Sequence, residues 1–451
     1  MSDYAHEEDM FSTEVPEVKD PPEFTLDPDQ ESAIDEIIEN KNTHYFVTGP
    51  AGCGKSTVLK ELKKYLKKSV VVCPTGMAAV NMGGQTLHSL FGIPPRMVTR
   101  GDAKVTDNEM KKRMLWFIKD IIIDEISMVR ADVLDFLDEF LRLNCHRDKP
   151  FGGKRIIMFG DLDQLPPVVT DKDAEFISTL YKSPYFFSAT SIRGCGMKVK
   201  YLHTIHRQKN DQGFITLLNA IKRNEITDEQ INEINRRVTR NETNKLTITA
   251  TNQVADFINR EQLSKLPSEM FTYQASSNGD FNSTYVPAPV ELKLKIGAQV
   301  VHLTNDSERG LVNGSRGVVV GLSDKSIVVK FTGKEEVTEI GRYTWENKKL
   351  KFVSHQQEIT ENVVGDFTQF PLKLGFASTT HKSQGQTFDE IHVDFGTSGA
   401  FASGMCYVAL SRCRTLQGIS LEVPITRKDI IIDVHVANFY RQMEETYGKR
   451  S

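Results

Sequence analysis

The sequence predicts an α/β protein with two parallel-sheet lobes and a small all-β insertion in the second lobe. Short apolar runs alternate with segments whose apolar residues recur at helical spacing, as strands and covering helices do in an α/β sheet. This pattern gives way to closely spaced short strands over about 298–353 and then resumes. A glycine-rich segment at 49–56 separates the first strand of the first lobe from the helix that follows it.

The bulk properties are those of a soluble globular protein. The 451 residues suffice for about three domains, and 39% of them are hydrophobic and 26% charged. We expect no membrane partner, because no apolar run is long enough to cross a bilayer and the N-terminus shows no secretion signal. The net charge of −4 means that any polyanion would have to be contacted in a local groove.

The six cysteines are scattered and include no C-x-x-C pair. This favours free thiols in a reducing compartment over a disulfide framework or a structural zinc site. We therefore expect a cytoplasmic protein, bacterial or viral by its compact length. A nuclear location stays open, because a basic import signal can be short.

The first 24 residues are acidic and contain three prolines, which predicts a flexible tail. Folding is expected to begin at Thr25, with Asp27 as a helix N-cap and Pro28 at the first helical position. Gln30 lies one turn into this helix and could read an adenine edge with its amide. Taken alone, it would more often be a solvated glutamine.

The segment 49–56 reads G-x-x-x-x-G-K-S and lies between a predicted strand at 45–48 and a predicted helix at 57–66. Such a P-loop turns backbone N–H groups and a helix N-terminus toward phosphates. Lys55 would reach the β- and γ-phosphates of a nucleotide, and the Ser56 hydroxyl would bind Mg²⁺. The alternative is a glycine loop without this role.

The next strand, 69–73, ends at Pro74-Thr75-Gly76 and opens a helix of small residues. Small residues at a helix N-terminus allow a phosphate backbone to approach closely. His88 follows, and alone it would more often be a partly buried histidine than a ligand. The segment from Pro94 to Lys112 is polar and irregular, which predicts a small insertion.

Two further strands of the first lobe end in polar residues. The run Ile121–Ile123 ends at Asp124, a candidate Mg²⁺ ligand, and Glu125, which could polarise an attacking water. The strand 154–160 is followed by Gln164, which could contact a γ-phosphate and sense its loss. Between them, 130–144 predicts an amphipathic helix whose apolar stripe packs on the sheet.

Two arginines could neutralise the charge that develops during phosphoanhydride hydrolysis. Arg207 closes the first lobe, and Arg412 lies on a predicted helix of the second lobe, at 407–414. An arginine delivered across a cleft would couple lobe closure to bound ATP. For a single helical arginine, a surface salt bridge is the alternative.

In the second half, a strand and turn are predicted at 245–252, a helix at 254–263, and further strands at 374–378, 391–395 and 419–423. Short strands with turn signals, including Asn313-Gly314, fill the β insertion. The polar cluster 379–387 follows the strand at 374–378.

The motifs resemble, in identity and order, those of superfamily 1 helicases. In chain order they are Gly-Pro-Ala-Gly-Cys-Gly-Lys-Ser, Pro-Thr-Gly-Met-Ala-Ala, Ile-Asp-Glu-Ile-Ser-Met, Gly-Asp-Leu-Asp-Gln-Leu-Pro-Pro, His-Arg-Gln, His-Lys-Ser-Gln-Gly-Gln-Thr and Tyr-Val-Ala-Leu-Ser-Arg-Cys-Arg. Within that superfamily the chain looks like the branch of RecD, Dda and the Pif (petite integration frequency) helicases. The stretch 132–159, with Lys-Pro-Phe-Gly-Gly at 149–153, resembles a segment that marks the Pif helicases. The resemblance spans about 26–440, and Cys53 departs from the usual threonine or serine.

The resemblance implies an ATP-dependent DNA helicase that moves 5′ to 3′ on single-stranded DNA and unwinds duplex or structured DNA by coupling hydrolysis to lobe closure. It implies two RecA-like lobes: residues 25–207, and residues 208–297 with 354–451. An insertion at about 83–112 would act as a wedge, and 298–353 would form an SH3-like β insertion. DNA repair, replication and recombination are the processes implied.

Matched residue by residue, the resemblance also implies a site. The catalytic residues would be Lys55, Glu125, Gln164, Arg207 and Arg412. The ATP site would further include Gln30, Gly49, Gly52, Gly54, Ser56, Thr57 and Gly385, with Mg²⁺ held by Ser56 and Asp124. Thr75, Gly76, Thr86, His88, Asn252, His381, Lys382 and Ser383 would lie along the DNA channel. The expected partners are single-stranded and forked or structured DNA, bound by a monomer.

A second function class stays open: a nucleotide-gated module that clamps single strands and remodels partners without separating duplex. The second lobe and its arginine favour the motor, because a simple switch needs only one lobe. RNA is a weaker alternative substrate, since single-strand channels grip phosphates and stack bases with little sequence preference.

Overall fold

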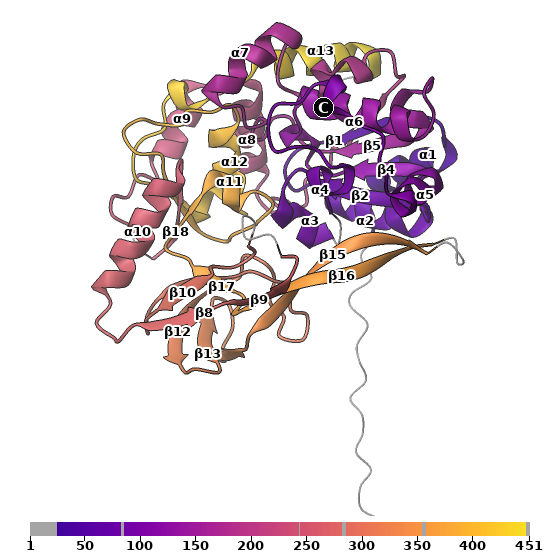
Figure 1. Cartoon of the computed structure of the whole chain (residues 1–451). Helices are drawn as coiled ribbons and strands as arrows, with labels where there is room; N and C mark the ends of the chain where they lie inside the picture. Colours follow the sequence, from indigo (N-terminus) through magenta and orange to yellow (C-terminus); the bar gives the residue numbers. More distant parts are fainter. Residues whose placement is uncertain (1–24, 83–84, 243, 282–285, 354–357, 448–451) are drawn as a thin grey trace, which may run out of the picture.

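The computed structural model describes residues 25–82, 85–242, 244–281, 286–353 and 358–447. The predicted tail at 1–24 lies outside the described residues. Two lobes and a β-rich part are visible in Figure 1, and the α/β fold class is confirmed. Among the described residues, no helix is long and apolar enough to cross a membrane.

Lobe 1 is built on six parallel strands in the order β3-β2-β4-β5-β1-β6. The strands are β1 (Tyr45–Thr48), β2 (Ser69–Cys73), β3 (Gln85–Thr86), β4 (Asp120–Ile123), β5 (Arg155–Phe159) and β6 (Lys198–Tyr201). The helices are α1 (Pro28–Glu39), α2 (Lys55–Tyr65), α3 (Gly76–Met82), α4 (Leu87–Phe91), α5 (Glu109–Phe117), α6 (Ala131–Asn144) and α7 (Asp171–Leu180).

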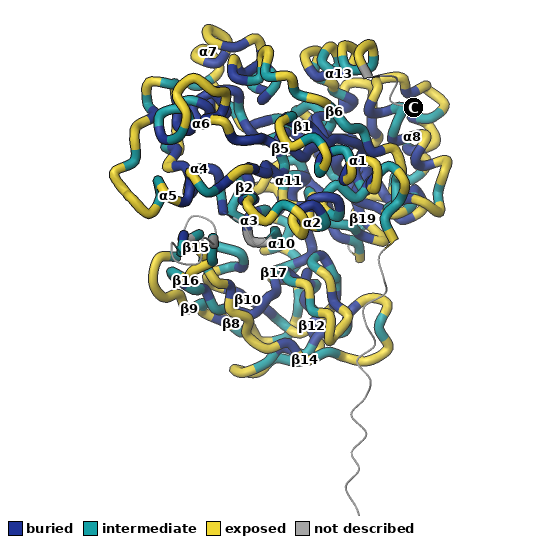
Figure 2. The backbone as a smooth tube through the Cα atoms, turned by 90° about the vertical axis from the view of Figure 1, so that its right-hand side faces the viewer, coloured by how far each residue is buried: buried dark blue, intermediate teal, exposed yellow. Residues whose placement is uncertain are grey.

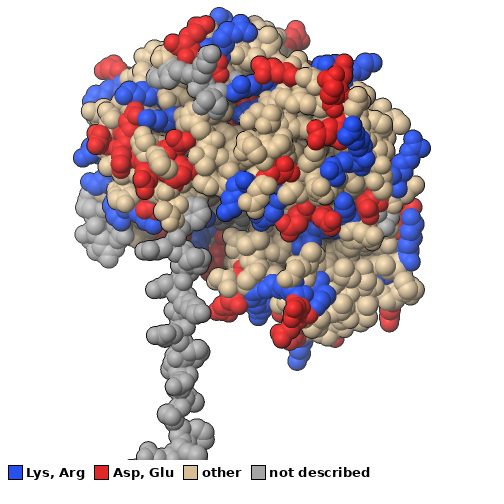
Figure 3. Space-filling model, turned by 180° about the vertical axis from the view of Figure 1, so that it is seen from behind, with Lys and Arg blue, Asp and Glu red and all other residues tan. Residues whose placement is uncertain are grey.

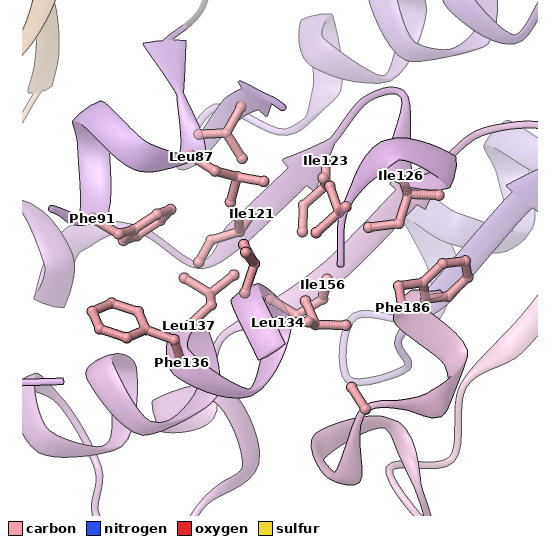
Figure 4. Close-up of a cluster of buried hydrophobic side chains, with 14 of the residues drawn as sticks. Leu87, Phe91, Ile121, Ile123, Ile126, Leu134, Phe136, Leu137, Ile156 and Phe186 are labelled. Carbon is pink, nitrogen blue, oxygen red and sulfur yellow. The ribbon is translucent and has the colours of Figure 1, made fainter. Parts of the chain in front are cut away.

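Both faces of this sheet are buried, so its strands are continuous apolar runs rather than alternating ones. Ile122 of β4 packs into a cluster with α1 and α2, whereas Ile121 and Ile123 pack into the cluster with α4 and α6. Figure 4 shows this second cluster, with Leu134 and Leu137 of α6 among its members. In Figure 2 the buried backbone follows the strands, and the exposed backbone follows the outer helices and loops.

The predicted insertion at 83–112 is more closely integrated than expected. Val98 and Ala103 are buried in the α4–α6 cluster, and α5 begins before the segment ends. Val98 and Ala103 are therefore lobe 1 core residues, although their polar neighbours obscure them in the sequence, whereas Val105 and Met110 are exposed. The wedge role stays a prediction.

Helix α6 is buried on its polar side as well as its apolar side. Asp132, Asp135 and Asp138 recur every three residues and are at most 2% exposed. Each accepts a backbone N–H, from Val98 (3.1 Å), Ser191 (2.7 Å) and Phe151 (2.6 Å), respectively. These acids tie three separate loops to α6, a role that an amphipathic prediction does not include.

Lobe 2 holds four parallel strands in the order β18-β7-β19-β20. They are β7 (Leu246–Thr249), β18 (Ala377–Thr379), β19 (Ile391–Asp394) and β20 (Ile419–Leu421). The helices that follow lobe 1 are α8 (Gln212–Arg223), α9 (Asp228–Asn235), α10 (Asn252–Lys265), α11 (Thr380–Ser383), α12 (Met405–Leu410) and α13 (Val434–Tyr447).

Helix α13 packs on lobe 1, although the prediction placed all of 354–451 in lobe 2. Val436 and Tyr440 belong to the lobe 1 core, and the Tyr440 hydroxyl lies 3.2 Å from Thr48 Oγ1 and 3.3 Å from the Leu162 N–H. Figure 1 shows the yellow C-terminal helix beside lobe 1. The last helix therefore bridges the two lobes.

The β insertion is wider than the predicted 298–353, because its strands extend from Phe271 to Leu374. A five-stranded antiparallel sheet has the order β14-β13-β12-β11-β17, and two smaller sheets pair β8 with β10 and β15 with β16 and β9. The strands are β8 (Phe271–Gln274), β9 (Ser276–Gly279), β10 (Glu291–Leu294), β11 (Gln299–His302), β12 (Arg316–Leu322), β13 (Ile327–Phe331), β14 (Thr338–Ile340), β15 (Tyr343–Val353), β16 (Glu358–Gln369) and β17 (Leu372–Leu374). The outer strands are polar and exposed, as in β9, so they give little apolar signal.

The hairpin of β15 and β16 extends from the insertion to lobe 1 (Figure 1). The Phe352 ring lies 5.2 Å from the Phe117 ring of α5, and Gln85 Nε2 donates to the Lys348 carbonyl at 3.0 Å. The insertion therefore touches lobe 1 through this hairpin.

Charges of both signs are interspersed on the face drawn in Figure 3. This agrees with the small net charge and with a polyanion contact confined to a groove.

Candidate nucleotide and DNA site

The loop between β1 and α2 is closely surrounded by other site residues. Gly52 and Gly54 have φ of +86° and +83°, a region that favours glycine. A Cβ on Gly52 would lie 2.6 Å from Arg207 Cβ, and one on Gly54 would clash with Gln30 Nε2. The fold thus brings Gln30 and Arg207, distant in sequence, to this loop, and only glycine leaves room for both.

Lys55 and Ser56 open α2 directly after this loop. Lys55 Nζ donates to the carbonyls of Gly49 (2.8 Å) and Pro50 (3.0 Å) and lies 3.7 Å from Cys53 Sγ. Ser56 is exposed, and Thr57 is half-buried. The loop carbonyls hold the ammonium group of Lys55 over the loop.

Asp124 and Glu125 follow β4, and burial affects both carboxyl groups. Burial raises the pKa of Asp124 although the Glu125 N–H and Lys55 oppose this shift. Burial, and then the charge of Asp124, raise the pKa of Glu125 to about 7. Glu125 also adopts a left-handed backbone, with φ of +51°, which costs on the order of 1–2 kcal/mol in a non-glycine residue. Such strain is concentrated at functional sites.

Gln164 is held by side chains from both lobes. Its Nε2 donates to Asp161 Oδ2 at 3.0 Å, and its Oε1 accepts from Gln384 Nε2 at 3.0 Å. The same Gln384 nitrogen lies 3.4 Å from Glu125 Oε2. The prediction missed Gln384, although it lies between the predicted residues Ser383 and Gly385, because nothing in the sequence indicated which member of the polar cluster points toward lobe 1.

Arg207 and Arg412 lie close together where the lobes meet. Arg412 is 1% exposed and donates from Nε to the Val408 carbonyl at 2.9 Å, and Arg207 donates to the Ser411 carbonyl at 3.1 Å. Burial, and then the charge of Arg412, lower the pKa of Arg207 to about 9. Within the described part of the chain, neither arginine forms an ion pair with a carboxylate, and neither does Lys55.

Helix α12, which precedes Arg412, contacts the P-loop directly. The Tyr407 hydroxyl accepts the Ala51 N–H at 3.0 Å. Tyr407 lies in the motif that carries Arg412, but the prediction gave it no role. A contact between backbone and hydroxyl across two lobes leaves no signal in a sequence.

Gln30 is fully buried, so it is not the solvated glutamine that its sequence context alone favours. Its Oε1 accepts the Asp27 N–H at 3.1 Å, and its Nε2 donates to the Cys53 carbonyl at 3.1 Å and lies 3.3 Å from His206 Nε2. This amide joins α1 to the P-loop. Adenine recognition by Gln30 stays a prediction.

The predicted DNA residues differ in their exposure. Asn252 and Lys382 are exposed, and Thr75, Gly76, Thr86, His88 and His381 are partly buried. Ser383 is fully buried and donates to the Thr380 carbonyl at 2.9 Å. Its place along a DNA channel stays a prediction. Burial lowers the pKa values of His88 and His381, which favours their neutral forms.

The site fits a nucleoside triphosphate with Mg²⁺. Lys55, Arg207 and Arg412 supply cations without carboxylate partners, and the glycine loop leaves the space that a Cβ would fill. Ser56 and Asp124 would hold the metal. Two protein oxygens suit Mg²⁺, which usually takes one or two side chains together with phosphates and water.

Known proteins share this architecture. The family model described as PIF1-like helicase matches residues 25–232, and the model of the DNA helicase Pif1 2B domain matches residues 283–322. The ATP-dependent DNA helicase PIF1 of Xenopus laevis is 31% identical over 458 residues, which cover 98% of this chain and 68% of that protein. The chain spans about two thirds of the length of the mammalian and frog relatives that it matches, from 61% to 68%.

Two solved structures of Bacteroides Pif1 differ in their fit to this chain. The complex with ADP-AlF4 has a TM-score of 0.87 at 36% identity, over 94% of this chain and 98% of that chain. The complex with ssDNA has a TM-score of 0.68 at 38% identity, over 95% of this chain and 100% of that chain. Because identity and coverage are nearly equal, the lower score reflects a different arrangement of parts.

Proposed function

The chain belongs to the PIF1-like helicase family, and from that premise we propose that it is an ATP-hydrolysing DNA helicase that moves 5′ to 3′ on single-stranded DNA. Its nucleotide substrate is ATP with Mg²⁺, and its DNA substrate is forked or structured DNA. DNA repair, replication and recombination are the processes it would serve. The observation that carries the proposal is the cationic site between the lobes, where Lys55, Arg207 and Arg412 meet beside Glu125.

The roles of the site residues follow from their positions. Lys55 and the loop N–H groups bind the phosphates, and Arg207 and Arg412 stabilise the negative charge that develops as the terminal phosphate leaves. Glu125, with a pKa near 7, accepts a proton from the attacking water. Bound Mg²⁺ neutralises phosphate charge and orients the phosphates for attack.

Coupling to DNA requires that lobe 2 responds to the nucleotide. Gln164 contacts Gln384 across the lobes, and Tyr407 contacts the P-loop, so both contacts depend on how the lobes are placed. We propose that hydrolysis changes this placement and moves the DNA-contacting residues of lobe 2 relative to those of lobe 1. A single copy of the chain would suffice for this cycle.

The test uses two duplexes that differ only in carrying a 5′ or a 3′ single-stranded tail. We expect ATP-driven strand separation only from the 5′ tail, measured by release of a fluorescent strand, with Lys55→Ala as the blank. Lys55→Ala should lose hydrolysis and keep single-strand binding. Unwinding only from the 3′ tail would contradict the direction.

The alternative, a nucleotide-gated clamp, makes a different prediction in the same assay. Neither duplex would open, yet single-stranded DNA would still stimulate hydrolysis. Single-stranded RNA in place of the DNA tail tests the remaining substrate class. Light scattering with and without DNA tests the single-copy proposal.

A further inference from the structure

A buried lysine of lobe 2 lies between two aspartates of lobe 1. Lys222 is on α8, and its side chain is 4% exposed. Its Nζ lies 3.0 Å from Asp163 Oδ2 and 3.9 Å from Asp161 Oδ1, and 3.4 Å from the Tyr201 hydroxyl. It also lies 5.8 Å from the ring centroids of Tyr201 and Tyr407. The two acids come from the loop after β5, so this cluster joins α8 to lobe 1.

The same loop reaches the reaction site. Asp161 uses its other oxygen, Oδ2, to accept the Gln164 amide at 3.0 Å. Gln164 in turn is held by Gln384, which also lies within 3.4 Å of Glu125. A continuous set of polar contacts therefore runs from Lys222 through Asp161, Gln164 and Gln384 to Glu125, the proposed general base.

The loop has little freedom to move independently of lobe 2. Gly404, the N-cap of α12, has φ of +72°, and a Cβ there would lie 2.7 Å from the Gln164 carbonyl oxygen and still closer to that of Asp163. The backbone of α12 thus packs directly on the loop from the side of lobe 2. Lys222 binds the same loop through the carboxylates of Asp161 and Asp163.

The charge of Lys222 is maintained in spite of burial. Burial opposes the charged form, but Asp163, Tyr201 and Asp161 outweigh it and raise the pKa of Lys222 well above its ordinary value. The ammonium is therefore present throughout the physiological range. Removing one partner of a buried ion pair is strongly destabilising, because it leaves the other charge buried and uncompensated.

We propose that Lys222 is a positioning residue for hydrolysis: by binding Asp161 and Asp163 it links α8 of lobe 2 to the loop that places Gln164 beside Glu125. This rests on the proposed function. When DNA changes the placement of lobe 2, Lys222 transmits the change to Gln164. The residue sets how strongly single-stranded DNA stimulates hydrolysis and has little effect on how tightly ATP is bound.

The test compares steady-state ATP hydrolysis with and without oligothymidine in wild type and in Lys222→Met, which keeps the length of the side chain and removes its charge. We expect the ratio of DNA-stimulated to basal kcat to fall about tenfold, while the KM for ATP stays within about twofold of wild type. Lys222→Arg should recover part of the ratio. The matched control is Lys265→Met on α10 of lobe 2, which removes a 57% exposed cation paired with Glu261 at the surface and should keep the wild-type ratio.

A second variant separates positioning from stability. Lys222→Met with Asp163→Asn removes the pair of charges together, so its thermal midpoint should recover toward wild type while its stimulation ratio stays low. The proposal is wrong if Lys222→Met keeps the wild-type ratio, or if the double variant restores the ratio along with the midpoint. A wild-type protein without DNA stimulation would instead contradict the proposed function.

Discussion

Glu125 combines a strained backbone with a carboxyl group whose pKa burial, and then Asp124, raise to about 7. A general base must be deprotonated, so the raised pKa reduces the active fraction as the pH falls through 7. We therefore expect kcat/KM for ATP, measured with saturating single-stranded DNA, to fall about tenfold for each pH unit well below 7.

The control for this pH profile is Glu125→Gln, which cannot accept the proton. Its hydrolysis should be lower by about two to four orders of magnitude at every pH, while nucleotide binding, followed by fluorescence, is retained. The nucleotide affinity of this variant, measured at each pH, shows how much of the pH dependence of kcat/KM comes from nucleotide binding and not from the general base. An acid limb near pH 4 in wild type would mean that Glu125 is not the group that titrates.

Some residues of the site could be predicted from the sequence, and others could not. Lys55, Asp124 and Glu125 were predictable because each holds a fixed position in a short local motif. Gln384 and Lys222 were not, because their amide and carboxylate partners lie more than fifty residues away and their roles depend on how two lobes meet. The burial of Ser383 was not predictable either, because a motif fixes the position of a residue in the chain but not the direction of its side chain.

At the scale of elements, the packing of α6 could be predicted from the sequence only in part. Its apolar stripe was predictable from helical spacing. The burial of its three aspartates was not, because it depends on loops that approach from three separate parts of lobe 1. The strands of the two α/β lobes were predictable as apolar runs, whereas polar strands such as β9 and β16 were outside the predicted insertion.

Asp135 of α6 provides a stability prediction. Its carboxylate accepts the N–H groups of Ser191 (2.7 Å) and Thr190 (3.1 Å) and the Tyr181 hydroxyl (3.1 Å). Asp135→Ala leaves these donors buried without an acceptor, so we expect a loss of about 3 kcal/mol. The measurement is the urea midpoint of the transition that includes lobe 1.

The matched control for this variant is Glu139→Ala, one turn further along α6. Glu139 pairs at 2.9 Å with Arg147, whose side chain is 62% exposed, and such a surface pair contributes about 0–1 kcal/mol. Equal shifts in the two variants would mean that α6 tolerates the loss of any acid and that the loop contacts add little.

At the scale of the whole molecule, the hairpin of β15 and β16 is the part of the insertion that touches lobe 1. The Phe352 ring of the hairpin packs against the Phe117 ring of α5. Lys68 Nζ lies 4.9 Å from the centroid of the same Phe117 ring. The chain resembles the Bacteroides structures with ADP-AlF4 and without ligand more closely than the ssDNA-bound one. We expect DNA binding to rearrange the parts of the molecule and to undock this hairpin, because the hairpin joins two of those parts.

If DNA undocks the hairpin, weakening the docking must favour the DNA-bound arrangement. An aromatic pair contributes about 1 kcal/mol beyond the burial of its rings, and Phe352 is 4% exposed, so Phe352→Ala should tighten single-strand binding by at least about fivefold. Fluorescence anisotropy with labelled oligothymidine at one fixed salt concentration measures this, with Val363→Ala, a 47% exposed position of the same hairpin, as the matched control. Unchanged affinity would mean that the hairpin stays docked when DNA binds, and weaker binding would mean that Phe352 supports the DNA-bound arrangement instead.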